Sequence, residues 1–140
     1  MPIVKIARLL ALAAGSLDLL TGFCFVFYPQ GILPLMHLET PAGEALVYLR
    51  FMGAFVLAVG ACYLLALVCG GLERLRAMLE LTILLRLSTG VFSTAALGLG
   101  SLSIGWVGVP IAGFTLIGIQ LWLLGKLRPD KIEPLSPRCR

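Results

Sequence analysis

Four long runs of hydrophobic residues, separated by short segments rich in polar residues, glycine or proline, dominate the sequence. The runs cover about residues 9–28, 45–69, 77–100 and 106–124. A bilayer core of ~30 Å requires about 20 residues of α-helix per crossing, so each run is long enough for one crossing. The pattern predicts an all-α fold, an integral membrane four-helix bundle.

The connections between the runs carry residues that interrupt helices. The first connection holds four of them: Pro29, Gly31, Pro34 and Pro41. We therefore expect residues 29–40 to form a non-helical connection at the level of the lipid headgroups. Gly70 and Gly71 are expected to end the second helix, and residues 101–105 to form a short turn.

The composition agrees with a membrane protein and leaves no length for a separate soluble domain. Of the 140 residues, 59% are hydrophobic and 13% charged, whereas a soluble domain is typically ~45–50% apolar and ~25% charged. We therefore expect one transmembrane domain at residues 1–125 and a basic cytoplasmic tail at 126–140. The expected partners are membrane lipids and another membrane protein or a second copy of the chain, with no nucleic acid.

The basic residues are distributed unevenly over the two sides that four crossings define. One side receives nine of the eleven Lys and Arg residues: Lys5, Arg8, Arg74, Arg76, Lys126, Arg128, Lys131, Arg138 and Arg140. The first and third connections contain none. Because basic loops stay in the cytoplasm, we predict that both termini are cytoplasmic and that the protein spans the inner (plasma) membrane of the cell.

Cysteine and histidine give no sign of a metal or redox centre. The four cysteines form no CxxC pair: Cys24, Cys62, Cys69 and Cys139. This spacing argues against a disulfide framework, a thiol redox site or a zinc cluster. His37 has Glu39 and Glu44 nearby, but one imidazole offers little nitrogen ligation for a metal. We expect neither a metal nor a cofactor.

Ionisable residues within the predicted spans are candidates for function. There are four: Asp18, Arg50, Glu80 and Arg86. Each costs ~2.5–3.5 kcal/mol on insertion scales, and such residues are normally paired and directed towards the bundle interior. Asp18 is nine positions past Leu9, and Arg86 is equally far past Ala77. At a rise of ~1.5 Å per residue both lie near ~13 Å, so we predict an ion pair at the middle of the membrane.

The other two intramembrane charges lie nearer the ends of their spans. Glu80 has two alternatives, pairing with Arg76 one turn earlier or reaching the cytoplasmic interface. Arg50 is expected to extend to the opposite surface. A further alternative places all four charges around one cavity, as a relay or a ligand pocket.

Two short segments of the chain resemble each other. Residues 17–22, Leu-Asp-Leu-Leu-Thr-Gly, align without gaps with residues 85–90, Leu-Arg-Leu-Ser-Thr-Gly, and place Asp18 opposite Arg86. A duplicated two-helix unit would make these positions symmetry mates about an axis along the membrane normal. Helices two and four show no comparable match.

Small residues in the second and fourth runs predict where helices approach closely. The candidate packing positions are Gly53, Gly60, Gly108 and Gly113. Between membrane helices apolar burial gives no driving force, so close backbone packing at small residues replaces it. A channel or a lipid site is the alternative use of these glycines.

The chain resembles small bacterial four-helix membrane proteins of the DoxX-like type and their uncharacterised relatives. Three features over about residues 5–125 carry the resemblance: Phe27-Tyr28-Pro29-Gln30, then Arg50-Phe51-Met52-Gly53 with Gly60-Ala61-Cys62-Tyr63, and finally Glu80, Arg86 and Gly90. The resemblance implies a four-helix fold. It assigns no catalytic residue.

Two functional hypotheses follow from the sequence. In the first, the protein is a non-catalytic accessory or scaffold subunit of a larger membrane complex. In the second, it is a small proton-coupled transporter or exporter that uses Asp18 as its intramembrane acid, although Arg86 at the same depth weighs against that analogy. We do not expect an enzyme, because no spacing assembles a nucleophile, a base and oxyanion donors.

Overall fold

The computed structural model describes residues 2–127, and all regular secondary structure in this part of the chain is helical. The helices are α1 (Pro2–Phe27), α2 (Pro29–Leu35), α3 (Glu44–Cys69), α4 (Leu72–Gly98), the 3-10 helix η1 (Ile104–Val107) and α5 (Gly108–Lys126). Most of the predicted basic tail, residues 128–140 with Cys139, lies outside the described residues.

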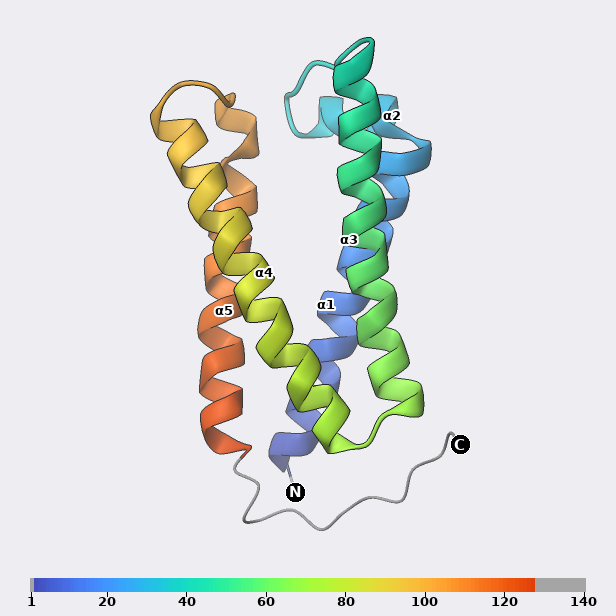
Figure 1. Cartoon of the computed structure of the whole chain (residues 1–140), viewed down its shortest axis with the longest axis vertical. Coiled ribbons are helices and arrows are strands. Elements are labelled where there is room, and N and C mark those ends of the chain that lie inside the picture. The colour runs from blue at the N-terminus through green and yellow to red at the C-terminus, as the bar shows by residue number, and fades with distance from the viewer. Residues whose placement is uncertain (1, 128–140) are drawn as a thin grey trace.

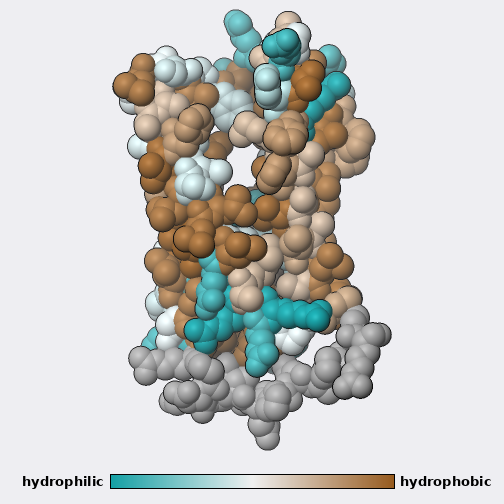
Figure 2. Space-filling view, viewed as in Figure 1, coloured by the Kyte–Doolittle hydropathy of each residue, from teal (hydrophilic) through white to brown (hydrophobic). Residues whose placement is uncertain are grey.

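The predicted all-α fold with four crossings is confirmed at the level of its helices. Four segments are long and apolar enough to span a membrane: Ile3–Phe27, Glu44–Cys69, Leu72–Gly98 and Ile104–Lys126. In the space-filling view, apolar side chains dominate the middle of the molecule and polar ones gather towards its two ends (Figure 2). These features identify a multi-pass membrane protein.

Two helices begin earlier than the hydrophobic runs predict. α1 starts at Pro2 rather than near residue 9, and α4 starts at Leu72 rather than near residue 77. Lysine, arginine and glutamate are good helix formers, and their long side chains reach the headgroup region from a helix end. The polar flanks therefore extend the helices instead of ending them.

The first connection is partly helical, which corrects the prediction that its prolines break any helix. α2 has Pro29 at its first position, where no N–H is needed for an intrahelical bond. It ends at Leu35; two residues later His37 has a φ of 57°, and the N–H of Leu38 donates to the Leu33 carbonyl at 3.0 Å. This is a standard helix stop, and Leu33 and Leu38 then pack against α1 and α3.

α1 and α3 are antiparallel and approach more closely than side chains would allow. Glycines seven residues apart make the contact on each helix: Gly15 and Gly22 on α1, and Gly53 and Gly60 on α3. A Cβ atom added at Gly60 would lie 2.5 Å from the backbone nitrogen of Leu19. The two backbones are therefore in direct contact.

α4 and α5 form the second antiparallel pair of the bundle. The turn between them begins at Gly100, whose φ of 69° favours glycine, and the N–H of Ser101 donates to the Ala96 carbonyl at 2.9 Å. Figure 1 shows the two pairs side by side, α1 with α3 and α4 with α5. The Gly70–Gly71 link connects them.

The two pairs meet at both ends of the bundle. The end that contains the start of α1 and Lys126, here termed the terminal end, holds a buried core to which all four long helices contribute: Ala7, Ala11, Ala14, Tyr63, Leu75, Leu79, Leu123 and Leu127. At the opposite end, the ring of Trp106 in η1 lies 6.1 Å from that of Phe25 in α1. Between these contacts the pairs diverge, and an open gap separates them in the space-filling view (Figure 2).

Candidate functional site

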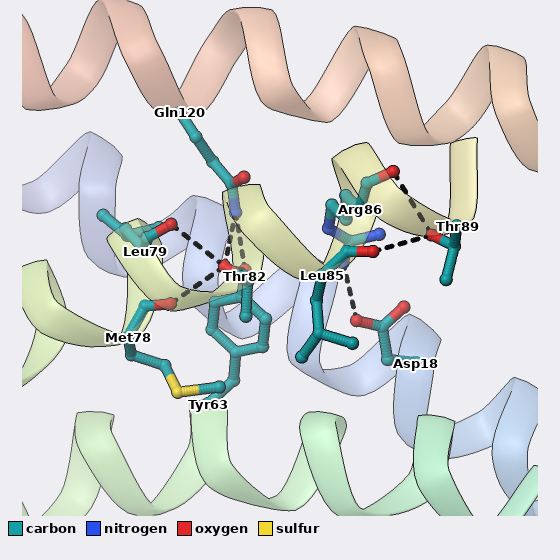
Figure 3. Close-up of polar contacts among 9 residues, drawn as sticks. All are labelled: Asp18, Tyr63, Met78, Leu79, Thr82, Leu85, Arg86, Thr89 and Gln120. Carbon is teal, nitrogen blue, oxygen red and sulfur yellow. Dashed lines mark hydrogen bonds and ion pairs between the residues drawn. The ribbon is translucent and has the colours of Figure 1, made fainter. Parts of the chain in front are cut away.

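Asp18 and Arg86 meet in the interior of the bundle and join its two helix pairs. Arg86 Nη2 on α4 donates to Asp18 Oδ2 on α1 at 2.6 Å, and the side chains are only 15% and 16% exposed. The close-up shows them pointing towards each other from different helices (Figure 3). The structure thus brings together the two residues that the sequence places at equal depth.

Although α1 and α4 begin earlier than predicted, Asp18 and Arg86 still lie at similar depth along their helices. Asp18 lies in the middle third of α1, and Arg86 lies in the middle third of α4. Because a charge at that depth is costly unless it is neutralised, each residue is the natural counterion of the other.

A pocket of about 260 Å³ lies beside the ion pair, between α3 and α4. This central pocket is lined by Asp18, Phe51, Met52, Phe55, Val56, Val59, Thr82, Leu85, Arg86 and Thr89. Its walls are mainly apolar, and its polar groups are the ion pair and two threonine hydroxyls. The pocket therefore combines an apolar body with a small polar patch, as ligand sites in proteins commonly do.

One turn from Arg86 along α4, a buried polar cluster joins three helices. Its members are Tyr63 of α3, Thr82 of α4 and Gln120 of α5, all fully buried. Tyr63 Oη lies 2.6 Å from Thr82 Oγ1, and Gln120 Nε2 lies 2.6 Å and 3.1 Å from these two oxygens respectively (Figure 3).

The direction of each hydrogen bond in this cluster follows from the available protons. The Thr82 hydroxyl donates to the carbonyls of Met78 and Leu79 at 2.9 Å and 3.1 Å. Tyr63 must therefore donate to Thr82, and the Gln120 amide donates to both hydroxyl oxygens. Gln120 Oε1 remains buried without a partner among the described residues.

The remaining intramembrane charges lie away from the central pocket. Arg76 Nε donates to Glu80 Oε1 at 2.8 Å on the exposed surface of α4, which is the first of the two alternatives for Glu80. Arg50 is exposed and makes no ion pair within the described part of the chain. Neither Arg50 nor Glu80 lines the pocket, so the alternative of four charges around one cavity is wrong.

The four predicted packing glycines behave differently. Gly53 and Gly60 form the α1–α3 contact, and Gly113 faces the Arg86 carbonyl, 3.7 Å from an added Cβ. At Gly108 an added Cβ would meet no described atom within 4 Å, so this glycine makes no close contact among the described residues and its packing role stays a prediction. Gly108 is the first residue of α5 and is exposed.

The two similar segments occupy comparable places in the two helix pairs. Each lies on the first helix of its pair, and its glycine faces the second helix: Gly22 meets the α3 backbone, whereas Gly90 meets the Phe114 ring of α5. The charged residues of the segments face each other as the ion pair. The tighter backbone contact exists only in the first pair.

Sequence reasoning missed the polar cluster. Gln120 is the only carboxamide within the fourth hydrophobic run, and such a residue normally bonds across helices. That signal points to Gln120 alone, because Tyr63 and Thr82 are common types in membrane helices and their contact depends on helix rotation.

The described residues offer little to a metal ion or a redox centre. They hold no group of three or more His, Cys, Asp or Glu side chains placed to bind a metal. Cys24, Cys62 and Cys69 are free thiols. The chemistry of the site therefore rests on the ion pair, the hydroxyls and the apolar walls.

Comparison with known proteins adds no relative. No protein-family model, curated protein or solved structure matches the chain. The resemblance to DoxX-like proteins stays a prediction.

Proposed function

We propose that the protein is a non-catalytic accessory or scaffold subunit of a larger complex in a bacterial inner membrane, with both termini in the cytoplasm. Five of the nine basic residues that predict this orientation are described, and they lie at the terminal end: Lys5, Arg8, Arg74, Arg76 and Lys126. In this role the bundle is a docking element for another membrane protein or for a second copy of itself.

The observation that carries the proposal is the set of glycines on the exposed face of α5. Gly118 and Gly125 are exposed, and a Cβ added at either would meet no described atom within 4 Å. They are seven residues apart, which is also the spacing of Gly15 and Gly22 on α1. Within this chain, glycines at that spacing hold two helices in backbone contact.

A helix that faces only lipid gains nothing from glycine. Glycine lowers helix stability by about 0.8–1.0 kcal/mol relative to alanine, and in a membrane its advantage is close approach of another helix. An exposed glycine row on α5 is therefore best explained by a transmembrane helix that packs there in the assembled complex.

The proposal is tested by purifying the tagged protein from its native membranes and identifying what remains bound. Gly118→Leu should release the partner, or the second copy, while the protein stays inserted and folded. Ala95→Leu is the control, because Ala95 is also exposed but lies on α4. Retention of every partner by Gly118→Leu would contradict the proposal.

Transport is the second candidate, and the central pocket is the observation that favours it. The pocket holds an intramembrane acid, Asp18. The buried core at the terminal end lies between this pocket and that end of the bundle. In a transporter, Thr89→Cys in a cysteine-free background would be labelled by impermeant thiol reagents from either side, and Asp18→Asn would change that access. If labelling of Thr89→Cys were the same with and without Asp18→Asn, the subunit role would be favoured over transport.

A further inference from the structure

The side chain of Arg86, which lines the central pocket, retains a hydrogen-bond donor without a partner. Arg86 Nε is buried and has no acceptor among the described residues, whereas Nη2 of the same guanidinium donates to Asp18. A buried donor without a partner is costly, so an acceptor on a ligand at this position would be stabilising.

The hydroxyl of Thr89 adds an acceptor rather than a donor to the polar patch. Thr89 already donates to the carbonyls of Leu85 and Arg86 at 2.9 Å and 3.2 Å. Its oxygen lone pairs, together with the carboxylate of Asp18, can accept from a ligand hydroxyl. The patch thus suits a head that both accepts and donates hydrogen bonds.

The charges of the patch select an uncharged head. Asp18 and Arg86 neutralise each other at 2.6 Å, so a charged ligand would bring a net charge into the middle of the membrane. Such a charge costs several kcal/mol unless it is balanced. A carboxylate or ammonium head is therefore disfavoured at this site.

The depth and the walls of the pocket select a lipid rather than a water-soluble molecule. Both charged residues lie in the middle thirds of their helices, far from the level of phospholipid headgroups. Phe51 and Phe55 on the α3 wall are 62% and 58% exposed, so the pocket can be reached from the acyl-chain region of the bilayer.

We propose that the central pocket binds an uncharged lipid of the acylglycerol type, with an ester carbonyl accepting from Arg86 and free hydroxyls donating to Asp18 and to Thr89. The acyl chain lies along the apolar wall formed by α3. This binding site does not involve the glycine row on α5, so evidence against the subunit role would not contradict it, and evidence against lipid binding would not contradict the subunit role.

The test measures binding of 1-oleoylglycerol to the purified full-length protein by native mass spectrometry from a non-ionic detergent. Oleate and oleylamine, which share the chain but carry a charge, are the matched ligands. We expect 1-oleoylglycerol to form a saturable 1:1 adduct. Its affinity should be at least about tenfold higher than that of either charged amphiphile, a difference of about 1.4 kcal/mol in binding free energy.

Variants separate binding in the pocket from general lipid adhesion. Val56→Trp fills the pocket and should abolish the adduct, whereas Leu84→Trp, on the exposed surface of α4 and outside the lining, should retain it. Thr89→Val removes one acceptor without changing the shape and should weaken binding by about fivefold, the effect of one hydrogen bond.

Three results would overturn the inference. They are the absence of a 1:1 adduct in the wild-type protein, equal binding by wild type and a folded Val56→Trp variant, and tighter binding of oleate or oleylamine than of 1-oleoylglycerol. If Val56→Trp fails to fold, unchanged affinity of Thr89→Val would contradict the assigned position of the head.

Discussion

The Tyr63 hydroxyl connects α3 to α4 and α5 through two short hydrogen bonds. Tyr63→Phe removes the donor to Thr82 and one acceptor of the Gln120 amide, without creating a cavity. We expect the free energy of unfolding to fall by about 0.6–1.7 kcal/mol, the range found for hydrogen bonds between membrane helices. Unfolding by SDS in mixed micelles measures it.

Tyr48→Phe provides the matched control for this substitution. Tyr48 lies on the same helix but is 67% exposed, so loss of its hydroxyl should leave the unfolding free energy unchanged. Equal effects of the two substitutions would show that the buried cluster adds no stability.

At the residue scale, the sequence predicts charged partners better than neutral ones. Asp18 and Arg86 have only one counterion each at the same depth, so sign and depth are enough to pair them. Tyr63, Thr82 and Gln120 meet only because their helices are rotated to bring them together, and rotation is set by packing that the hydrophobic pattern does not encode. The exposure of Arg50 needs no knowledge of helix rotation, because its position near the end of the second hydrophobic run already predicts that its side chain reaches the surface.

At the element scale, the glycines of the α1–α3 contact are the most sensitive positions. A Cβ added at Gly22 would clash with the backbone nitrogen of Leu57 and lie 2.7 Å from the Gly53 carbonyl oxygen. Backbone atoms cannot move aside as a side chain can, so we expect Gly22→Ala to destabilise the protein by at least about 1–3 kcal/mol. The same SDS titration measures the change.

Gly118→Ala is the control for the glycine contact, because an added Cβ there meets open space. In the purified protein it should be neutral or slightly stabilising, since alanine favours the helix. A destabilisation equal to that of Gly22→Ala would mean that helix flexibility, rather than the close contact, explains the role of Gly22.

The helices themselves were predictable, whereas their contacts were only partly so. Hydrophobic length gives the four crossings because the bilayer fixes the number of residues each needs. α2 was missed because proline is compatible with the first turn of a helix as well as with a loop. Gly53 and Gly60 were expected to pack, but their partners Gly15 and Gly22 on α1 required the antiparallel register of the two helices.

At the scale of the whole molecule, the orientation in the membrane is a separate prediction. Ser101→Cys, in a background without the four native cysteines, should react with an impermeant maleimide added from outside the cell. Glu73→Cys, at the terminal end of α4, should react only after the membrane is opened. Labelling of Ser101→Cys from the cytoplasmic side alone would reverse the assignment.

The whole molecule consists of two helix pairs that meet at their ends and diverge between them. In the interior, the Asp18–Arg86 ion pair joins α1 of one pair to α4 of the other. We infer that this ion pair links the two halves energetically as well as geometrically. If the two charges did not interact, removing one of them would cost the same unfolding free energy whether or not the other was present.

A double-mutant cycle at Asp18 and Arg86 tests this claim most directly. Asp18→Ala or Arg86→Ala alone should cost ~3–5 kcal/mol of unfolding free energy, less any partner found in the unfolded state, because each leaves an unpaired buried charge. The double substitution should cost clearly less than the sum. The exposed pair Arg76 and Glu80 is the control and should show a coupling of only about 0.3–0.5 kcal/mol. Additive effects at Asp18 and Arg86 would contradict the account.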